Sequence, residues 1–506
     1  MSNLKPEKMK NTEDKNSVSR RDFLRNSATA AAGFMILPSN VISGLGYKAP
    51  SDKLNIAGVG VGGMGRANLR NLNSENIVAL CDVDWNYAQN CFNDYPKAQK
   101  FYDWREMFDK IGKSIDGVVV ATADHAHAII ASHAMTLGKH VYVQKPLTLT
   151  VYESRLLTAL ARKHKVVTQM GNQGNSGEGL RLMCEWIWNG EIGEIKEVHA
   201  WTNRPIWPQG LERPTEVMKI PDTMKWDLFL GPAPERPYHS IYTPWNFRGW
   251  WDFGTGALGD MACHILDPVF KGLNLLYPSK VQGSSTLVNT ESAPRAEVVT
   301  YVFPARPDMP NVKMPEVKVT WWDGGFLPPR PEELPAGDQM GHDGNGGCLF
   351  IGSKGKMMCG CYGKDPWIIG RENPNVAKSI RRIETSHEMD WVRACKEGYD
   401  KVKKENTMPS SNFDYSGPLN EMVTMGVVAV RLQDLKRILE WDGANMKFTN
   451  ISETDTLKII TQDKFEVHDG HPTFHTAYTD PINAKQFAAE LIKKPYRQGW
   501  SLPEMP

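Results

Sequence analysis

The sequence predicts an α/β protein: a doubly wound parallel sheet of the Rossmann type, followed by an α+β domain with a mostly antiparallel, open sheet. Three observations lead to this fold class. Short, continuously apolar segments alternate with helical segments between residues 54 and 172. A glycine-rich turn directly follows the first segment, and beyond residue 172 apolar and polar residues alternate within the strand-like segments. Continuous apolar runs are typical of parallel strands buried on both faces, whereas alternation is typical of antiparallel strands with one solvated face.

The N-terminal sheet is expected to contain five strands. These lie at residues 54–61, 77–81, 117–121, 141–143 and 166–170. Helical segments separate them, for example at residues 151–163. Because strand and helix alternate, we expect a parallel sheet with helices on both faces.

The second domain is expected to combine helices with an antiparallel sheet. Its predicted helices lie at residues 179–188, 256–270, 388–396 and 419–441, and its predicted strands at residues 195–201, 316–322 and 348–351. Residues 304–347 are rich in Pro and Gly and, outside the predicted strand, are expected to form surface loops.

We therefore divide the chain into four parts. These are a leader and linker at residues 1–50, a Rossmann domain at residues 51–172, a substrate-binding and catalytic domain at residues 173–465, and a C-terminal extension at residues 466–506.

The leader resembles an export signal. Arg20 and Arg21 precede Phe23 and Leu24, and a mildly apolar stretch follows at residues 28–37. This order is typical of the twin-arginine route, and the apolar stretch is too short to span a bilayer. We therefore expect a periplasmic or otherwise exported protein with no membrane span in its mature chain. A disordered basic leader is the alternative interpretation.

The composition excludes several classes of partner. The chain carries 59 basic and 58 acidic side chains, so neither a nucleic-acid partner nor a membrane-surface patch is expected. Its eight Cys include no Cys-x-x-Cys pair. Buried free thiols are therefore expected rather than a zinc ribbon or redox dithiol.

The turn Gly60-x-Gly62-x-x-Gly65 has the pattern of a dinucleotide site. The first Gly permits the tight turn, the second lets the backbone approach a pyrophosphate, and the third lets helix pack on strand. The pyrophosphate would lie at the N-terminus of the helix, where free N–H groups favour negative charge. Asp82 ends the next strand with no Arg or Lys adjacent, so it would accept hydrogen bonds from the adenosine ribose and repel a 2′-phosphate. NAD is therefore expected rather than NADP; a glycine turn with a surface Asp is the alternative.

Further motifs follow later strands and continue into the second domain. Residues 121–127 read Ala-Thr-Ala-Asp-His-Ala-His, residues 143–146 Val-Gln-Lys-Pro, residues 259–264 Gly-Asp-Met-Ala-Cys-His, and residues 350–356 Phe-Ile-Gly-Ser-Lys-Gly-Lys. Together with the glycine turn and Asp82, they resemble the glucose–fructose oxidoreductase, inositol dehydrogenase and rhizopine-catabolism (Gfo/Idh/MocA) family. The resemblance covers nearly all of the chain after the leader. It implies an NAD-dependent oxidoreductase that forms a homo-oligomer, a dimer or a tetramer.

The resemblance also implies roles for particular residues. Lys145 would contact the nicotinamide ribose and the substrate hydroxyl, His264 would be the catalytic acid or base, and Asp260 would hold the substrate or tune the histidine. The implied cofactor-binding residues are Gly60, Gly62, Met64, Gly65, Asp82, Asp124, His127, Gln144, Lys145 and Asn172. The chain departs from the family twice: Gln144 replaces the usual Glu, which removes a charge beside the cofactor ribose, and Ala123 replaces the usual Pro.

These residues suit the chemistry without the resemblance. Oxidation of an alcohol needs a base for the O–H proton, and His titrates near neutrality. Asp260, His264 and Asp267 share one face if their segment is a single helix. Lys145 ends a strand, at the carboxyl edge where such sheets bind ligands. A capped, solvated helix face is one alternative and a metal site another, but no second His lies nearby, so no metal is expected there.

Tryptophans gather just before this segment. Trp245, Trp250 and Trp251 suit an aromatic wall for a pyranose ring, with Trp251 as the expected substrate contact and Trp201 and Trp207 as further candidates. Core packing is the alternative interpretation.

We therefore expect an NAD-dependent oxidoreductase that acts on a secondary hydroxyl of a sugar or glycoside, with C3 as one candidate carbon. Two alternatives stay open. One is an NAD-dependent glycosidase that oxidises C3, eliminates the aglycone and reduces the product again, as the NAD-dependent α-N-acetylgalactosaminidases do. The other is a non-catalytic sugar- or dinucleotide-binding protein.

Overall fold

The computed structural model describes residues 52–342 and 344–506. The predicted twin-arginine leader lies outside the described residues, and export therefore stays a prediction. Residues 54–506 form one compact unit, so the boundaries proposed at residues 172 and 465 also stay predictions.

The N-terminal sheet is parallel throughout and has the strand order β3-β2-β1-β4-β5-β6. Its strands are β1 (Asn55–Val59), β2 (Asn76–Cys81), β3 (Gln99–Phe101), β4 (Gly117–Val120), β5 (His140–Val143) and β6 (Thr168–Met170). Helices connect them: α2 (Met64–Asn71), α3 (Trp85–Asp94), α4 (Trp104–Ile111), α5 (Asp124–Thr136) and α6 (Val151–His164). The order reverses between β1 and β4, and this is the place where open sheets of this kind bind ligands.

All five predicted strands are present, and the doubly wound sheet is confirmed. The strand that the sequence did not reveal is β3, at the edge of the sheet. Its residues Gln99 and Lys100 are exposed and only Phe101 is buried. An edge strand with two exposed polar residues contains no apolar run, so the apolar periodicity of the sequence does not predict it.

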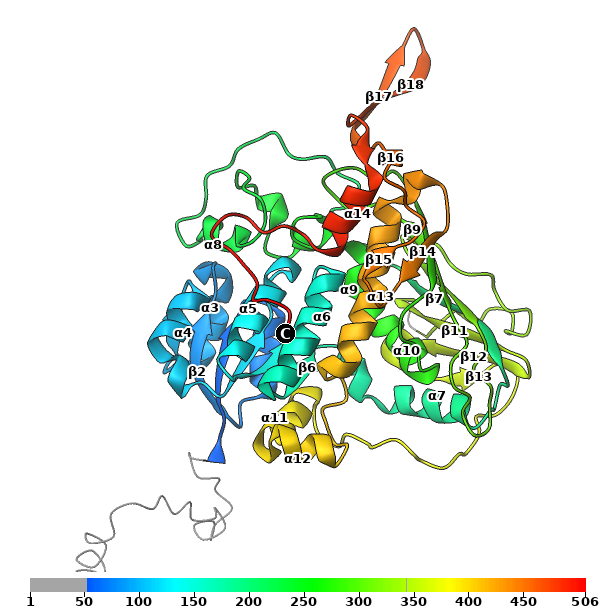
Figure 1. Ribbon diagram of the computed structural model, residues 1–506, viewed down its shortest axis with the longest axis horizontal. Coiled ribbons are helices and arrows are strands. Elements are labelled where there is room, and N and C mark those ends of the chain that lie inside the picture. Colours follow the sequence, from blue (N-terminus) through cyan, green and yellow to red (C-terminus); the bar gives the residue numbers. More distant parts are fainter. Residues whose placement is uncertain (1–51, 343) are drawn as a thin grey trace, which may run out of the picture. The chain divides into compact units, whose positions relative to one another are not determined.

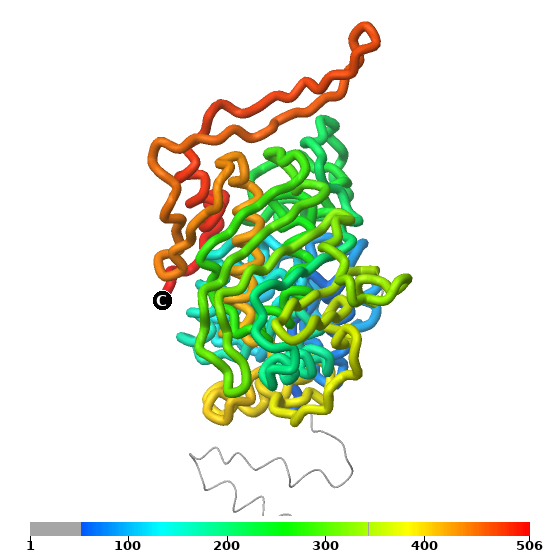
Figure 2. The backbone as a smooth tube through the Cα atoms, turned by 90° about the vertical axis from the view of Figure 1, so that its right-hand side faces the viewer, coloured from blue at the N-terminus to red at the C-terminus, as the bar shows by residue number. Residues whose placement is uncertain are grey.

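The second sheet has nine strands in the order β13-β12-β11-β7-β10-β9-β8-β14-β15. Only β7 and β10 pair in parallel, so the predicted, mostly antiparallel sheet is confirmed. The strands are β7 (Ile195–Thr202), β8 (Lys280–Ser285), β9 (Glu297–Phe303), β10 (Val317–Trp322), β11 (Gly346–Gly352), β12 (Gly355–Gly360), β13 (Trp367–Ile368), β14 (Leu439–Asp442) and β15 (Lys447–Phe448). Buried residues alternate with partly exposed ones along β9, as expected of a sheet covered on one face. Figure 2 shows this sheet in green and yellow in front of the helices that cover its inner face.

Eight further α-helices lie beyond the N-terminal sheet within the described residues. They are α7 (Glu178–Trp188), α8 (Trp226–Leu230), α9 (Gly256–Ile265), α10 (Asp267–Gly272), α11 (His387–Glu397), α12 (Tyr399–Lys404), α13 (Phe413–Arg431) and α14 (Ala484–Ile492). Two small ladders complete the fold, β16 (Thr456–Leu457) with β19 (Ile482–Asn483) and β17 (Ile460–His468) with β18 (His471–Tyr478). Long helix α13 lies between the two large sheets in Figure 1.

Two helix predictions were wrong in their extent. The helix expected at residues 256–270 is two helices that meet at Leu266, with Pro268 in the first turn of α10. The helix expected at residues 419–441 starts earlier and ends at Arg431, and Leu439–Asp442 is strand β14, paired with β8. Leu439 and Trp441 are buried and alternate with Glu440 and Asp442, and so short a segment can be read as the end of a helix or as a strand until its pairing with β8 is known.

Segments distant in sequence return to the N-terminal sheet. Helix α11 packs against it through Trp391, whose indole N–H donates to the Val167 carbonyl at 3.3 Å. After α14 the chain crosses back to α8 and α4, where Arg497 bonds the Gly231 carbonyl and Trp500 packs near Trp104. The C-terminal residues thereby become part of the cofactor side of the molecule.

All eight Cys are free and buried, as predicted. Within the described ranges, no helix combines the length and the apolar character that a membrane span requires.

The glycine turn is closely packed. Gly60 has φ +78°, and a Cβ on Gly65 would lie 2.1 Å from the Gly60 carbonyl oxygen. Gly65→Ala should therefore lower the free energy of unfolding by about 1–3 kcal/mol, because the turn must shift to admit the methyl group. Urea unfolding followed by tryptophan fluorescence measures this. Gly112→Ala is the matched control, because its Cβ would meet only Phe108 atoms at 3.7 and 3.8 Å. Equal unfolding midpoints for both variants would contradict the packing argument.

Candidate active site

A cavity opens at the carboxyl ends of the parallel strands. Residues that follow five of these strands line it, Tyr102 after β3 among them, and so do segments from later in the chain. From the sheet edge come Gly60, Gly62, Gly63, Met64, Asp82, Val83, Asp84, Ala121, Thr122, Ala123, Asp124, Gln144 and Lys145. From beyond the Rossmann segment come Phe229, Gly231, Pro232, Trp245, Phe247, Arg248 and Trp500.

The Asp82 carboxylate binds the backbone of the glycine turn. One carboxylate oxygen accepts hydrogen bonds from the backbone N–H of Val61 at 2.7 Å and of Gly62 at 3.1 Å, and the other accepts from Asp84 N–H at 3.0 Å. Burial raises the pKa of Asp82 to about 6, although these hydrogen bonds act in the opposite direction. Asp82 therefore fixes the turn and still borders the cavity, as its predicted contact with a ribose requires.

The turn and Asp82 fit a dinucleotide. The space beside Gly63 is bounded by the Tyr87 hydroxyl, which a Cβ there would approach to 2.8 Å, and a Cβ on Gly62 would strike the Tyr87 ring. Only glycines leave the backbone accessible at this point. The backbone N–H groups at the start of α2 would hold the pyrophosphate.

Lys145, Asp260 and Arg248 form a compact charge cluster. The Lys145 ammonium donates to the Asp260 carboxylate at 2.7 Å and to its carbonyl oxygen at 3.0 Å. Arg248 Nε donates to the same carboxylate oxygen at 2.7 Å. Burial alone would raise the pKa of Asp260, but the charges of Lys145 and Arg248 outweigh it and hold that pKa well below its usual range. The cluster joins the end of β5, helix α9 and the loop before α9.

His264 lies one turn along α9 from Asp260 and is buried. Its Nδ1 has no hydrogen-bond partner. Burial, assisted by the Lys145 charge, lowers its pKa well below the ordinary value, so the ring is neutral at pH 7. The edge of the Tyr362 ring packs against the imidazole at a centroid distance of 4.6 Å. Every residue of α9 is buried, which rules out the solvated helix face as an interpretation.

Asp124 is a further carboxyl group in the cavity wall. It begins α5 and accepts a hydrogen bond from the Thr255 hydroxyl at 3.1 Å. Burial raises its pKa to about 7; Asp260 adds to the shift, and Arg248 and Lys145 oppose it.

Gln144 borders the cavity as predicted, and the structure explains its amide. Its Nε2 donates to Asn68 Oδ1 at 2.8 Å, while Asn68 Nδ2 donates to Glu388 Oε1 at 2.9 Å. All three side chains are buried. A carboxylate at residue 144 could accept only from the Asn68 amide N–H, and Asn68 would then no longer donate to Glu388. This chain of hydrogen bonds therefore favours Gln over Glu at residue 144.

Three predicted cofactor residues lie outside the cavity wall: Gly65, which packs on Gly60, and the side chains of Asn172 and His127. Asn172 donates to the Asp267 carboxylate at 3.0 Å and accepts from the Ser411 hydroxyl at 2.5 Å. His127 contacts the carbonyl oxygens of Pro146 at 2.8 Å and Thr122 at 3.1 Å. Both are buried parts of the frame behind the site.

Asp267 does not share a helix with Asp260 and His264, contrary to the sequence interpretation. It begins α10, and its carboxylate accepts from Asn175 at 2.8 Å and from the Tyr415 hydroxyl at 2.5 Å. The break at Leu266 turns this side chain away from the α9 face.

The three neighbouring tryptophans do not form one wall. Trp245 borders the cavity, is 47% exposed and stacks on Arg248, whose guanidinium carbon lies 4.1 Å from its ring centroid. Trp250 and Trp251 are buried and donate to the carbonyls of Ile241 and Asn289. Trp251 lines a different cavity from the one that Lys145 borders, and its substrate contact stays a prediction. The other two candidates, Trp201 and Trp207, are core residues.

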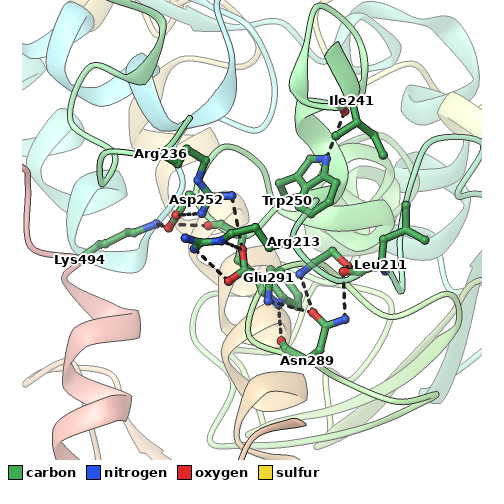
Figure 3. Close-up of polar contacts among 11 residues, drawn as sticks. Leu211, Arg213, Arg236, Ile241, Trp250, Asp252, Asn289, Glu291 and Lys494 are labelled. Carbon is green, nitrogen blue, oxygen red and sulfur yellow. Dashed lines mark hydrogen bonds and ion pairs between the residues drawn. The ribbon is translucent and has the colours of Figure 1, made fainter. Parts of the chain in front are cut away.

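An ion cluster supports the loop that carries Trp250. Asp252 bonds Lys494 at 2.8 Å and pairs with Arg236, while Glu291 bonds Arg213 at 3.0 Å (Figure 3). Burial alone would raise the pKa of Asp252, but the charges of Lys494 and Arg236 lower it to about 2. Lys494 thereby ties the C-terminal segment to the loop before α9.

Sequence reasoning missed Arg248, Tyr362 and Trp500. Arg248 has no motif around it, and Trp500 lies close to the C-terminus in a segment without periodicity. Tyr362 has φ 66°, which is uncommon for a residue with a side chain. No local pattern in the sequence indicates that any of the three lies at the site.

The fold and this site define a class: two-domain oxidoreductases with a Rossmann dinucleotide domain. Residues 54–172 match the family model described as the oxidoreductase family, NAD-binding Rossmann fold, and residues 194–295 match the C-terminal alpha/beta domain of the same family. These two segments belong to the Gfo/Idh/MocA oxidoreductase family, and the first of them is an NAD-binding Rossmann domain.

Individual relatives are distant. Inositol 2-dehydrogenase of Salmonella typhimurium is 29% identical over 148 residues, 28% of this chain and 44% of that protein. A glycosyl hydrolase family 109 protein of Shewanella pealeana is 25% identical over 202 residues, 35% of this chain and 44% of that protein. This chain therefore spans less than half the length of either relative.

A solved structure extends the likeness to most of the fold. The WlbA dehydrogenase of Bordetella pertussis, in complex with NADH and UDP-GlcNAcA, aligns with 77% of this chain and 99% of its own, with a TM-score of 0.51 and 14% identity. At this identity the likeness shows the fold alone.

The Asp124 shift predicts a pH effect on stability. Asp124 has a raised pKa of about 7 when folded, against an ordinary value of 3.8. Between these values the unfolded state has lost the proton that the folded state keeps, so stability falls as pH rises and the contribution is lost above about 7. From pH 5 to pH 8, wild type should lose about 2–3 kcal/mol more than Asp124→Asn. Urea unfolding at each pH measures the difference, because other titrating groups are common to both proteins. Parallel pH curves would show that Asp124 ionises normally.

Proposed function

We propose that the protein is an NAD-dependent oxidoreductase that acts on a secondary hydroxyl of a sugar or glycoside. The observation that carries this proposal is the position of Lys145. It borders the same cavity as the glycine turn, and its ammonium is held by Asp260 rather than by solvent. The fixed donor therefore lies where an oxygen of a substrate beside the cofactor would be.

Lys145 and His264 have different roles in the proposed reaction. NAD, when bound, accepts the hydride from the carbinol carbon. Lys145 donates a hydrogen bond to the substrate oxygen and stabilises the negative charge that develops there. His264 is not among the residues that border the cavity, but it lies one helical turn from Asp260 and is neutral with an unpartnered Nδ1, so we assign to it the acceptance of the proton. Asp260 holds Lys145 and so positions it.

The lining of the cavity favours a substrate with several hydroxyls. Lys145, Arg248 and Asp124 offer charged or polar groups within one wall, and Trp245 gives an exposed flat ring at the same cavity. Groups of this kind bind neighbouring hydroxyls and orient the carbon that faces the cofactor. Similarity to an inositol 2-dehydrogenase, which acts on a cyclic polyol according to its name, supports this substrate class.

A second candidate function is an NAD-dependent glycosidase. The similarity to a glycosyl hydrolase family 109 protein favours it. Transient oxidation at C3 acidifies the hydrogen at C2, elimination then expels the aglycone, and water addition and reduction complete a hydrolysis without net NADH. Both candidates start with the same hydride transfer, so the same site residues serve both.

Replacement of Lys145 or His264 should lower turnover strongly and spare cofactor binding. Lys145→Ala and His264→Asn should each lower kcat by on the order of 100-fold or more, the usual scale for a positioned acid or base. NAD binding, measured by calorimetry, should persist. Lys163→Ala, an exposed Lys on α6, is the matched control and should keep full activity. Near-wild-type turnover in His264→Asn would remove that residue from the mechanism.

A panel of aryl glycosides separates the two candidate functions. Incubation with enzyme and NAD should give either NADH without aglycone, for a dehydrogenase, or aglycone without net NADH, for a glycosidase. The 3-deoxy analogue of any reactive glycoside should be inert, because the reacting hydroxyl is absent and buried polar groups lose their partner. Absorbance at the NADH and aryl-alcohol wavelengths records both products together. Equal processing of the 3-deoxy compound would exclude C3 as the site of oxidation, and reaction of small linear alcohols alone would exclude a sugar substrate.

A further inference from the structure

A hairpin near the C-terminus stands apart from the site. Strands β17 and β18 form a two-stranded sheet of their own, which a single β-bridge between Ile460 and Asn289 joins to the rest of the fold, and they project from it (Figures 1 and 2). Asp469 and Gly470 form the two-residue turn, with φ of 50° and 80°. Positive φ at both positions is the requirement of a tight hairpin turn whose twist matches its strands. The turn fixes the register, with His468 opposite His471.

This register separates two kinds of side chain. Phe465 and Phe474 are opposite each other, with ring centroids 5.2 Å apart, on one face. Glu466 and His468 follow at alternate positions and so lie on the other face. His475, opposite Lys464, joins them from the second strand.

Three of these side chains converge on one point. His468 Nε2 lies 3.1 Å from Glu466 Oε2, and His475 Nε2 lies 3.4 Å from the same oxygen. The three atoms all lie within 4.8 Å of one another. In a tetrahedral zinc site with bonds of about 2.0–2.1 Å, neighbouring ligand atoms are about 3.3 Å apart. The two short distances already have this value.

We propose that Glu466, His468 and His475 bind one divalent transition-metal ion of the zinc class. Two neutral imidazoles and one carboxylate are the ligand set that such ions prefer over Mg²⁺ or Ca²⁺. Three of the 13 histidines of the chain lie within residues 468–475, and short His-rich tracts are typical of metal binding. The ion would link the two strands near their tip and leave a fourth position to water or another ligand.

The site is independent of the catalytic proposal. The sequence expectation of no metal concerned the segment around Asp260 and His264, and the described residues gather no such cluster there. All three hairpin ligands are exposed, so the ion has access without opening of the fold.

Calorimetric titration of ZnCl₂ into the full, untagged chain after treatment with a chelator tests the proposal. One ion should bind per chain, and MgCl₂ should give no binding. Loss of a group that merely supports a metal ligand costs on the order of 10- to 100-fold in affinity, so His468→Ala and His475→Ala should each weaken binding by at least about 10-fold. His471→Ala, in the same tract, is the matched control and should bind like wild type. Equal losses in all three variants would indicate binding by the tract as a whole and overturn the assigned site, as would wild-type binding in His475→Ala. Circular dichroism of each variant checks that the fold is retained.

Discussion

The salt bridge between Lys145 and Asp260 is the interaction on which the active region depends. Lys145 ends a strand of the first sheet, and Asp260 lies on a buried helix of the second half of the chain. Arg248 joins the same carboxylate oxygen. Because all three charges are withdrawn from water, loss of Asp260 would leave two cations in a poorly solvated place, which is far more costly than loss of an exposed pair. The requirement to keep these charges together fixes the relative position of the sheet edge and α9.

Neutral and charged networks extend this constraint behind the cavity. Gln144, Asn68 and Glu388 connect the cofactor side of the first sheet to α11, and Asn420 on α13 accepts from the backbone N–H of Leu147 at 2.9 Å. Each of these partners comes from a distant part of the sequence. Buried amides that satisfy one another specify a single arrangement, because any alternative leaves a donor or acceptor without a partner. The residues after Lys145 are thus held by the second half of the chain.

Gln144 illustrates how one family accommodates a change beside the cofactor. The resemblance implies a Glu at this position, yet the Asn68 amide is oriented by Glu388 so that its oxygen faces residue 144. An amide donor satisfies that oxygen, whereas a carboxylate would repel it. The uncharged side chain at residue 144 is therefore coupled to Asn68 and Glu388 through these two hydrogen bonds.

The sequence by itself determined the parallel sheet, the glycine turn, Asp82 and the two segments that carry Lys145 and His264, because apolar periodicity and short motifs are local. It did not determine which polar groups meet. Asp267 left the predicted helix face because the helix breaks at Leu266, and Trp251 turned into a separate cavity. Arg248 reached the site through a loop with no periodicity. These placements are decided by burial and pairing between segments far apart in the chain, and only the tertiary structure brings such segments together.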